Sequence, residues 1–199
     1  MKKMAYDIVG IQKKLQRSMD EWRFVHTLGV AYTATSLAMV HGGDIKQARL
    51  AGLLHDCAKS RSANNLLRLC RKNGIKINSA EQADPSLLHA KVGALIARSK
   101  YKIIDADVLD AIRFHTTGKP AMSKLGKIIY IADFIEPNRK ELDCLTAIRE
   151  AAFADLDEGM YLILKNILEW LEEKNETIDD VSRSAFEYYA NIHNQNKSH

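Results

Sequence analysis

Apolar residues recur three and four positions apart along most of the chain, the spacing that lines one face of an α-helix. Segments with this spacing run for a dozen residues or more, and only three prolines and ten glycines interrupt the sequence. The pattern therefore predicts an all-α fold.

A long first helix is expected from about residue 19 to residue 41, with Ser18 as its N-cap and Gly42-Gly43 as its stop. Its inward face should carry a stripe of mostly apolar and small residues, namely Trp22, Val25, His26, Gly29, Thr33, Leu37 and Val40. This pattern directs the His26 side chain into the protein.

The next helix should begin after Asp44 and run to about Ala58, with Ala48, Ala51, Gly52 and His55 on its close-packed face. Residues 62–73 form a further helix that ends at Gly74, and a loop is expected over about 75–83. Asp84-Pro85 then provides a cap and a first-turn proline for a helix that carries His89 near its start.

Five more helices are expected over about residues 105–115, 123–134, 141–153, 155–174 and 182–192. The apolar repeat of the fourth of these predicts core positions at Tyr161, Leu162, Leu164, Ile167, Leu168 and Leu171. The chain of 199 residues shows no linker or repeat, so we expect a single domain.

The composition argues against several classes of protein. No apolar run approaches the roughly 18 to 20 residues of a membrane span, and Met1-Lys2-Lys3 leads into an amphipathic segment and not into a signal-peptide core. Cys57, Cys70 and Cys144 are widely spaced and odd in number, which favours reduced thiols. We expect a cytoplasmic protein without a membrane partner.

The net charge of +4 is mild, and no long basic stripe with interleaved aromatic residues supports binding to nucleic acid. The same charge suits a small anionic substrate. The sequence does not define the oligomeric state, and the protein could form a homodimer.

Asp56 and Asp133 stand out because both lie in apolar helical sequence. An unpaired buried carboxylate costs several kcal/mol, so each needs a cation partner or a place in a cleft. A lone inward histidine is more often a hydrogen-bonded core residue, and a lone aspartate more often pairs with Arg or Lys. Together, however, His26, His55, Asp56 and Asp133 offer two imidazoles and two carboxylates. They predict a divalent metal site, and the mixed donors suit iron, manganese, cobalt or zinc more than calcium.

The order His26, His55-Asp56, Asp133 is also the pattern of the HD superfamily of phosphohydrolases. Over nearly the full chain, longer strings resemble the bacterial symmetrical diadenosine-tetraphosphate hydrolases, the YqeK family. The strings are Arg23-Phe24-Val25-His26-Thr27-Leu28-Gly29-Val30, His55-Asp56-Cys57-Ala58-Lys59, Leu87-Leu88-His89-Ala90, Phe114-His115-Thr116-Thr117-Gly118 and Ala132-Asp133-Phe134-Ile135-Glu136-Pro137-Asn138-Arg139.

The resemblance implies an HD-type helical bundle that holds iron and cuts diadenosine tetraphosphate, or a related dinucleoside polyphosphate, in its middle to give two ADP. We expect a metal-binding core over about residues 19–140, C-terminal helices over about 141–193 and a short flexible tail at 194–199. In this family the segment at about residues 176–181 would face the nucleoside, although the match there is loose.

Residue by residue, the resemblance implies His26, His55, Asp56 and Asp133 as metal ligands. Lys59 joins these four as a catalytic residue. The expected substrate and phosphate contacts are Arg23, Asp56, Cys57, Ala58, Lys59, His89, His115, Thr116, Asp133 and Arg139.

Several of these residues have a plainer interpretation. Lys59 could hold a phosphate beside Asp56, or be an exposed lysine past a helix end. His89 and His115 could complete a second metal site or donate hydrogen bonds to phosphate. Thr116 and Arg139 suit phosphate binding, but a helix terminus and a solvated surface arginine would explain them equally well.

Two rival functions share much of this pattern. Another HD phosphohydrolase, acting on a deoxynucleoside triphosphate, a guanosine alarmone or a nucleoside monophosphate, would have the same metal site. Lys59 follows the His55-Asp56 pair where many nucleotidases and alarmone hydrolases carry acidic residues. A regulatory HD protein that binds nucleotide without turnover would be expected to lack some ligands, whereas all four are present here.

Overall fold

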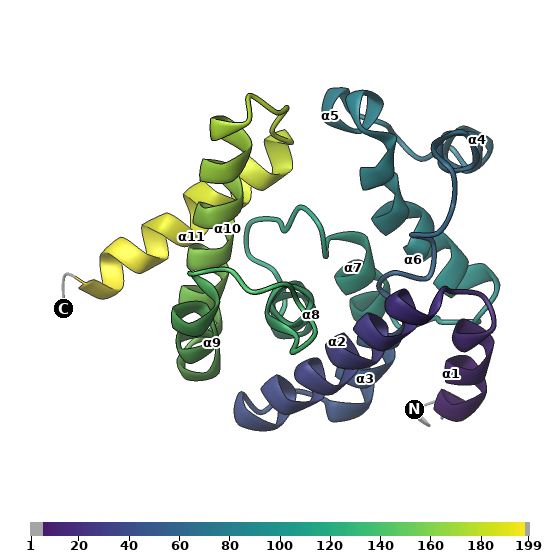
Figure 1. Cartoon of the computed structure of the whole chain (residues 1–199), viewed down its shortest axis with the longest axis horizontal. Helices are drawn as coiled ribbons and strands as arrows, with labels where there is room; N and C mark the ends of the chain where they lie inside the picture. Colours follow the sequence, from purple (N-terminus) through teal and green to yellow (C-terminus); the bar gives the residue numbers. More distant parts are fainter. Residues whose placement is uncertain (1–5, 198–199) are drawn as a thin grey trace.

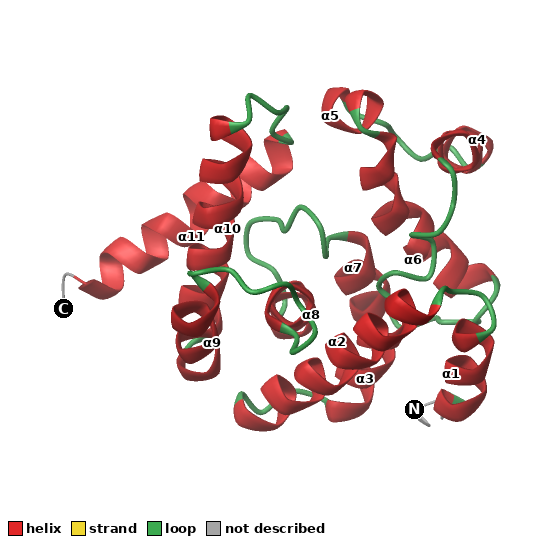
Figure 2. Cartoon of the chain, viewed as in Figure 1, coloured by secondary structure: helices red, strands yellow, loops and turns green. Residues whose placement is uncertain are grey.

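The computed structural model describes residues 6–197, and every regular element in this range is helical (Figures 1 and 2). The all-α prediction is confirmed. The predictions for Met1-Lys2-Lys3 and for the last two residues, Ser198 and His199, lie outside the described residues. The elements are α1 (Ile8–Gln16), α2 (Glu21–Val40), α3 (Ile45–Leu54), α4 (Ala63–Lys72), α5 (Ser79–Ala83), the short 3₁₀ helix η1 (Pro85–Leu88), α6 (His89–Ser99), α7 (Ala106–Arg113), α8 (Lys124–Ile135), α9 (Leu145–Ala154), α10 (Leu156–Glu173) and α11 (Asp180–Lys197).

Most helices begin where a short polar side chain can accept a hydrogen bond from the first-turn backbone N–H groups, which have no partner within the helix. This holds for the N-caps of α3, α4, α7, α8 and α10, which are Asp44, Ser62, Asp105, Ser123 and Asp155. These five helix starts agree to within one residue with the starts predicted from the sequence.

The beginning and the inward face of α2 were predicted wrongly. Its N-cap is Asp20, which accepts a hydrogen bond from the Arg23 N–H at 2.8 Å, whereas the Ser18 hydroxyl donates to the Leu15 carbonyl. On the predicted inward face, His26, Gly29 and Leu37 are buried, but the side chains of Trp22, Val25 and Val40 are exposed.

Other boundaries also differ. Helix α3 ends at Leu54, so His55 and Asp56 lie in the turn that follows and not inside a helix running to Ala58. The predicted loop at 75–83 contains α5, and α9 starts at Leu145, later than the predicted 141. Helix α11 continues to Lys197, so residues 194–197 are helical and not a flexible tail.

Helix α8 lies in the middle of the molecule and is seen almost end-on in Figure 1. It packs against α2, α3 and α7 on one side and against α9 and α10 on the other. Helix α11 packs on α10, and one continuous hydrophobic core reaches from Ile11 to Tyr189. Because α8 contacts both groups of helices, it brings their facing surfaces to one cleft.

The pairing of α2 with α3 depends on a close backbone approach. A methyl group added at Gly52 would lie 2.7 Å from the Ala31 Cα, which is shorter than van der Waals contact. Inserting even one methyl group into such a contact typically costs about 1–3 kcal/mol. Gly52 therefore lets α3 approach α2 closely and end beside His26.

Within residues 6–197, no helix is long and apolar enough to cross a membrane. Cys57, Cys70 and Cys144 are all free thiols, as the sequence predicts.

Candidate metal centre and substrate cleft

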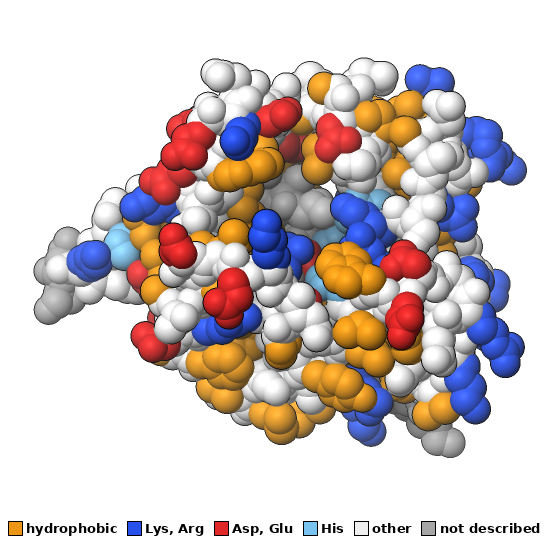
Figure 3. Space-filling model, viewed as in Figure 1, with side chains coloured by type: hydrophobic (Ala, Val, Ile, Leu, Met, Phe, Trp, Pro, Cys, Tyr) orange, Lys and Arg blue, Asp and Glu red, His pale blue; other side chains and the backbone are white. Residues whose placement is uncertain are grey.

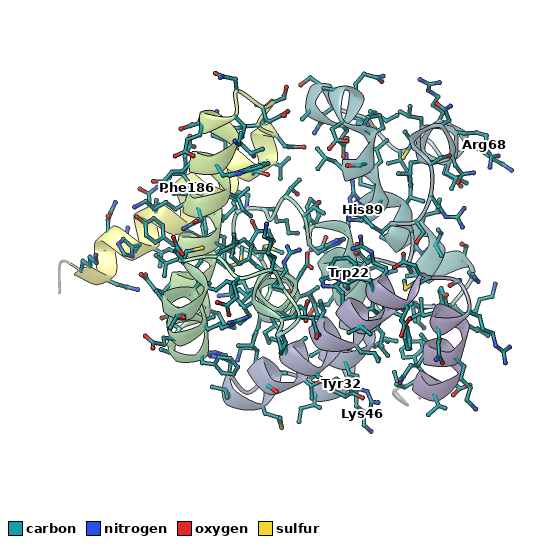
Figure 4. All side chains as sticks on the ribbon, viewed as in Figure 1. Trp22, Tyr32, Lys46, Arg68, His89 and Phe186 are labelled. Atoms are coloured by element: carbon teal, nitrogen blue, oxygen red, sulfur yellow. The ribbon has the colours of Figure 1, made fainter. Side chains whose placement is uncertain are left out.

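A cleft of about 300 Å³ opens beside the central helix α8. Figure 3 shows histidine, lysine and arginine side chains gathered at the hollow in the middle of this face, and Figure 4 shows Trp22 and His89 near its centre. The residues that line it are Trp22, Arg23, His26, Asp56, Lys59, His89, His115, Thr116, Tyr130, Asp133, Phe134, Arg139, Ile163 and Ile167. Nearly all the predicted site residues therefore come together.

Five of these side chains, together with the fully buried His55 beside them, form what we call the cleft floor: His26, His55, Asp56, His89, His115 and Asp133. All except the partly exposed Asp133 are buried. They come from α2, from the turn after α3, from the start of α6, from the turn after α7 and from α8. Residues far apart in the sequence thus meet at one point.

His26 lies in the second turn of α2 and is 2% exposed. The Trp22 ring stacks parallel to the His26 ring, with 5.8 Å between the two ring centres. Its Nδ1 donates to Glu136 Oε1 at 3.0 Å. Its Nε2 lies 3.1 Å from Asp133 Oδ1 and 4.0 Å from Asp56 Oδ2. The ring is thus fixed with Nε2 toward the two aspartates.

His55 is fully buried, and its Nδ1 donates to the Gly52 carbonyl at 2.7 Å. Its Nε2 faces Asp56 Oδ2 and Asp133 Oδ1, each at 3.7 Å. In the part of the chain that the structure describes, His55 Nε2 is the one buried side-chain nitrogen or oxygen without a hydrogen-bond partner. Such a buried nitrogen needs a ligand, and a metal ion would satisfy it.

His89 and His115 face each other on the other side of Asp56. Their Nδ1 atoms donate to the carbonyls of Ser86 at 2.5 Å and Ile112 at 2.8 Å. Their Nε2 atoms lie 3.1 Å apart, and 3.2 and 3.5 Å from Asp56 Oδ1. Two neutral rings in this arrangement would point lone pairs at each other, so a proton or a cation between them is favourable.

The two oxygens of Asp56 therefore face two different groups of donors. Oδ2 faces His26 and His55, and Oδ1 faces His89 and His115. Donor atoms about 2.1 Å from one ion lie roughly 3.0 to 3.5 Å apart in octahedral or tetrahedral coordination. The observed separations of 3.1 to 4.0 Å fit metal binding with small adjustments.

Both carboxylates of the cleft floor are held in the charged form. Burial alone would raise the pKa of Asp56, but attraction to the His55 ring when that ring is protonated, and hydrogen bonds from His115 and His89, hold the pKa well below its usual value. Burial has the same effect on Asp133, and the hydrogen bond from His26 outweighs it, so its pKa is also lowered. The floor therefore offers two negative charges to a cation.

The histidines respond differently to burial. Burial lowers the pKa of His55 to about 4, so its ring is neutral at pH 7 and can donate its lone pair. Burial also lowers the pKa of His89. Burial lowers the pKa of His26 and of His115 too, but Asp133 and Asp56 respectively outweigh it, and these two pKa values are raised. Competition between protons and metal is therefore expected mainly at His26 and His115.

The cleft rim, defined as Arg23, Lys59, Thr116 and Arg139, supplies positive charge and a hydroxyl. The Arg23 guanidinium donates to Asp56 Oδ2 at 2.7 Å and lies 5.0 Å from the centre of the Trp22 ring. Lys59 Nζ is 3.4 Å from His89 Nδ1. Because this nitrogen donates to the Ser86 carbonyl, it cannot accept a hydrogen bond from Lys59, and the ammonium is free to bind an anion. Arg139 is exposed beside the Phe134 ring.

The side chains of Cys57 and Ala58 do not line the cleft. Cys57 Sγ contacts the Gly93 carbonyl at 3.5 Å, and Ala58 is 1% exposed in the core. Residues 176–181 are also absent from the cleft lining, and Asp179 instead accepts a hydrogen bond from Asn78 at 2.8 Å. The expected substrate contacts of these residues stay predictions.

Sequence reasoning missed the buried Glu136 and the cleft residues Trp22, Tyr130, Phe134, Ile163 and Ile167. Glu136 is the C-cap that follows α8 and has a non-helical backbone, so no helical spacing from Asp133 indicates it. Trp22 precedes His26 by four residues, the spacing of stacked side chains on a helix. Ile163 and Ile167 of α10 carry no local signal, because in the sequence an apolar residue that lines a cleft looks the same as one in the core.

Comparison with known proteins identifies the group to which this arrangement belongs. Residues 23–138, more than half of the chain, match the family described as HD domain. Two similar curated proteins bear the name bis(5'-nucleosyl)-tetraphosphatase, symmetrical. The one from Halalkalibacterium halodurans is 42% identical over 160 residues, 80% of this chain and 84% of the relative. The one from Staphylococcus aureus is 35% identical over 185 residues, 92% of this chain and 94% of the relative.

A solved structure is similar over almost the whole chain. It is described as a predicted HD superfamily hydrolase involved in NAD metabolism from Clostridium acetobutylicum, with 35% identity and a TM-score of 0.90. The likeness covers 95% of this chain and 100% of that one. The helical arrangement around the cleft is thus shared with a protein of known structure.

Proposed function

The chain belongs to the HD-domain family, and from this premise we propose that it is a metal-dependent hydrolase that converts diadenosine tetraphosphate and water to two ADP. One observation carries the proposal: a buried cluster of four histidines and two ionised aspartates lies at the bottom of a cleft whose rim is cationic. A metal ion fits the cluster, and a polyphosphate fits the rim.

His26, His55, Asp56 and Asp133 are the proposed ligands of the metal. His55 Nε2 has no other partner, and both carboxylates are charged, which supports the assignment. When bound, the metal supplies Lewis-acid activation of water and stabilises negative charge on phosphoryl oxygens. The residues of the chain hold that ion in place and orient the substrate around it.

A second ion beside His89 and His115 extends the proposal. Asp56 Oδ1 and both Nε2 atoms lie within 3.5 Å of one another and face away from the first group of ligands. Two-ion sites of phosphohydrolases share a carboxylate between ions roughly 3.5 to 4 Å apart. The alternative for His89 and His115 is hydrogen bonding to a phosphate, and metal stoichiometry decides between them.

Iron is the proposed metal, with manganese, cobalt and zinc as the other outcomes of elemental analysis. The two imidazoles and two carboxylates form a mixed nitrogen and oxygen donor set, which suits first-row transition metals more than calcium or magnesium.

Lys59 and Arg139 are proposed to bind the phosphate chain, and Arg23 and Thr116 to contribute beside them. All four line the cleft above the metal ligands. The planar fork of Arg139 suits two phosphate oxygens, and the ammonium of Lys59 offsets the charge that develops on a leaving ADP. Catalytic roles therefore fall to His26, His55, Asp56, Lys59 and Asp133.

The reaction itself defines the decisive test. Water adds to the second phosphorus of one adenosine half, the central bridging bond breaks, and the other half leaves as ADP. In heavy-oxygen water, one ADP should carry the label on its terminal phosphate and the other should be unlabelled. Mass spectrometry of early products would contradict symmetrical cleavage if ATP and AMP appeared in equal amounts.

A substrate panel separates this function from its rivals. Metal-loaded protein should prefer diadenosine tetraphosphate over deoxynucleoside triphosphates, guanosine alarmones and nucleoside monophosphates. Faster turnover of one of these would assign the site to another HD phosphohydrolase. Binding of nucleotide without any turnover would identify a regulatory protein.

We further propose a single-domain enzyme that acts in the cytosol as a homodimer. The cleft is lined from both the 19–140 part and α10, which supports one domain. The exposed side chains of Val25, Tyr32 and Phe153 line an apolar groove that a second copy could cover. Light scattering should then give twice the chain mass of 22.4 kDa.

A further inference from the structure

His26 is held differently from the other three histidines of the cleft floor. The Nδ1 atoms of His55, His89 and His115 donate to main-chain carbonyls three residues earlier in their own turns. His26 lies inside a continuous helix, where the carbonyls of the preceding turn already accept backbone hydrogen bonds. It donates instead to the carboxylate of Glu136, which lies 110 residues later at the end of α8.

Glu136 is itself fixed on several sides. Its side chain is 0% exposed, and its Oε2 accepts hydrogen bonds from the Asn138 backbone N–H at 2.8 Å and the Asn138 amide at 3.0 Å. The Arg149 guanidinium holds the adjoining backbone by donating to the carbonyl oxygen of Ile135 at 3.1 Å. A methyl group added at Gly29 would collide with Glu136 Oε2, so the glycine leaves room for the carboxylate.

A buried carboxylate held this firmly is costly unless it has a function or a charge partner. Glu136 does not line the cleft, so it cannot touch the substrate. Its one contact toward the site is His26 Nδ1, and its effect must therefore pass through that ring.

We propose that Glu136 is a positioning residue that fixes the Nδ1–H form of His26, aims its Nε2 at the metal and makes that nitrogen a stronger donor. Partners of this kind orient ligand histidines and raise their basicity. The inference rests on the proposed metal-dependent reaction, but metal binding alone tests it, whatever the substrate.

The experiment uses the Glu136→Gln variant of the full chain. Its amide has the size of the carboxylate and can still accept a hydrogen bond, so the helical fold should persist. After removal of bound metal with a chelator, each protein is titrated with Co²⁺ and followed by the visible absorption of the bound ion. The affinity of the ion bound by His26 should fall about 10- to 100-fold, and its absorption bands should shift.

Glu158→Gln is the matched control. Glu158 Oε2 accepts from His193 Nδ1 at 2.6 Å, so it makes the same kind of pair, but between α10 and α11 and away from the cleft. This variant should bind Co²⁺ with wild-type affinity and spectrum. An equal loss in both variants would mean that the effect is general and would overturn the proposal.

Gly29→Ala approaches the same carboxylate from the opposite side. It leaves Glu136 and His26 chemically intact but pushes Oε2 away from its place, so it should weaken Co²⁺ binding in the same direction. Wild-type Co²⁺ affinity and spectrum in folded Glu136→Gln would overturn the proposal. Unfolding of both Glu136→Gln and Gly29→Ala would assign Glu136 to fold stability instead. Failure of the proposed substrate would appear only in the product panel, not in these titrations.

Discussion

The cleft floor and the cleft rim are only a few ångströms apart, yet they are built in opposite ways. On the floor, each of the four histidines uses Nδ1 for a fixed protein partner and directs Nε2 toward an ionised aspartate. On the rim, Arg23 is fixed by its bond to Asp56, but Arg139 is exposed and Lys59 has only a long contact to His89. The difference indicates that metal binding requires a preorganised site, whereas a flexible phosphate chain can be bound by adaptable cations.

The largest effect is expected from Asp56→Ala, because Asp56 faces both groups of donors on the floor. Loss of a ligand weakens metal binding directly, so turnover should fall by more than about 100-fold, beyond the range for residues that only orient ligands. His55→Ala should behave similarly. Elemental analysis, circular dichroism and turnover measure the result. Full activity with stoichiometric metal in either variant would contradict the assignment.

Removal of the metal from the wild-type protein should abolish turnover and also lower its melting temperature. A ligand at 100 times its Kd stabilises the native state by about 2.7 kcal/mol, which corresponds to roughly 5 to 11 °C for a domain of this size. Thermal scans with and without chelator measure the shift. The shift should disappear in Asp56→Ala and persist in Arg139→Met, and equal shifts in both would remove the distinction between floor and rim.

Substitutions on the rim should have intermediate effects. Lys59→Met and Arg139→Met each remove a charge-assisted contact worth about 1.5–3 kcal/mol, so kcat/KM should fall roughly 10- to 100-fold. Metal content should stay at the wild-type level because no ligand is lost. Unchanged kinetics would mean that the residue is an ordinary solvated side chain without a role in phosphate binding. Loss of bound metal would mean that it belongs with the residues of the cleft floor.

The smallest effect is expected from Cys57→Ser. Although Cys57 adjoins Asp56, its Sγ contacts the Gly93 carbonyl and does not line the cleft. A serine hydroxyl can donate to the same carbonyl, so steady-state kinetics should change by less than about twofold and stability by about 1 kcal/mol or less. A large rise in KM would instead support the substrate contact predicted from the sequence.

The sequence was informative about the floor because charged residues there break an apolar pattern. Asp56 and Asp133 stand out for this reason, and His26 and His55 are placed by helix spacing. The sequence was less informative where two neighbouring residues could play the same structural role. Ser18 and Asp20 can both cap a helix, and only the observed bond from Arg23 to Asp20 decides between them.

Exposure along α2 was mispredicted for a related reason. Apolar residues occur on every side of this helix, so periodicity alone could not choose the buried face. Trp22 was assigned to the core, whereas it stacks on His26 at the edge of the cleft. Glu136 was missed because its partner lies 110 residues away, a separation that no local pattern encodes.

Helix α10 contributes Ile163 and Ile167 to the cleft but lies outside residues 23–138, the stretch that matches the family. The chemical step and the shape of the adjoining wall are therefore encoded in separate parts of the gene. Mutation can reshape the wall while the ligands stay intact, so a lineage could acquire a new nucleotide preference without first losing catalysis. On this view α10 is the place where related enzymes can diverge at little risk.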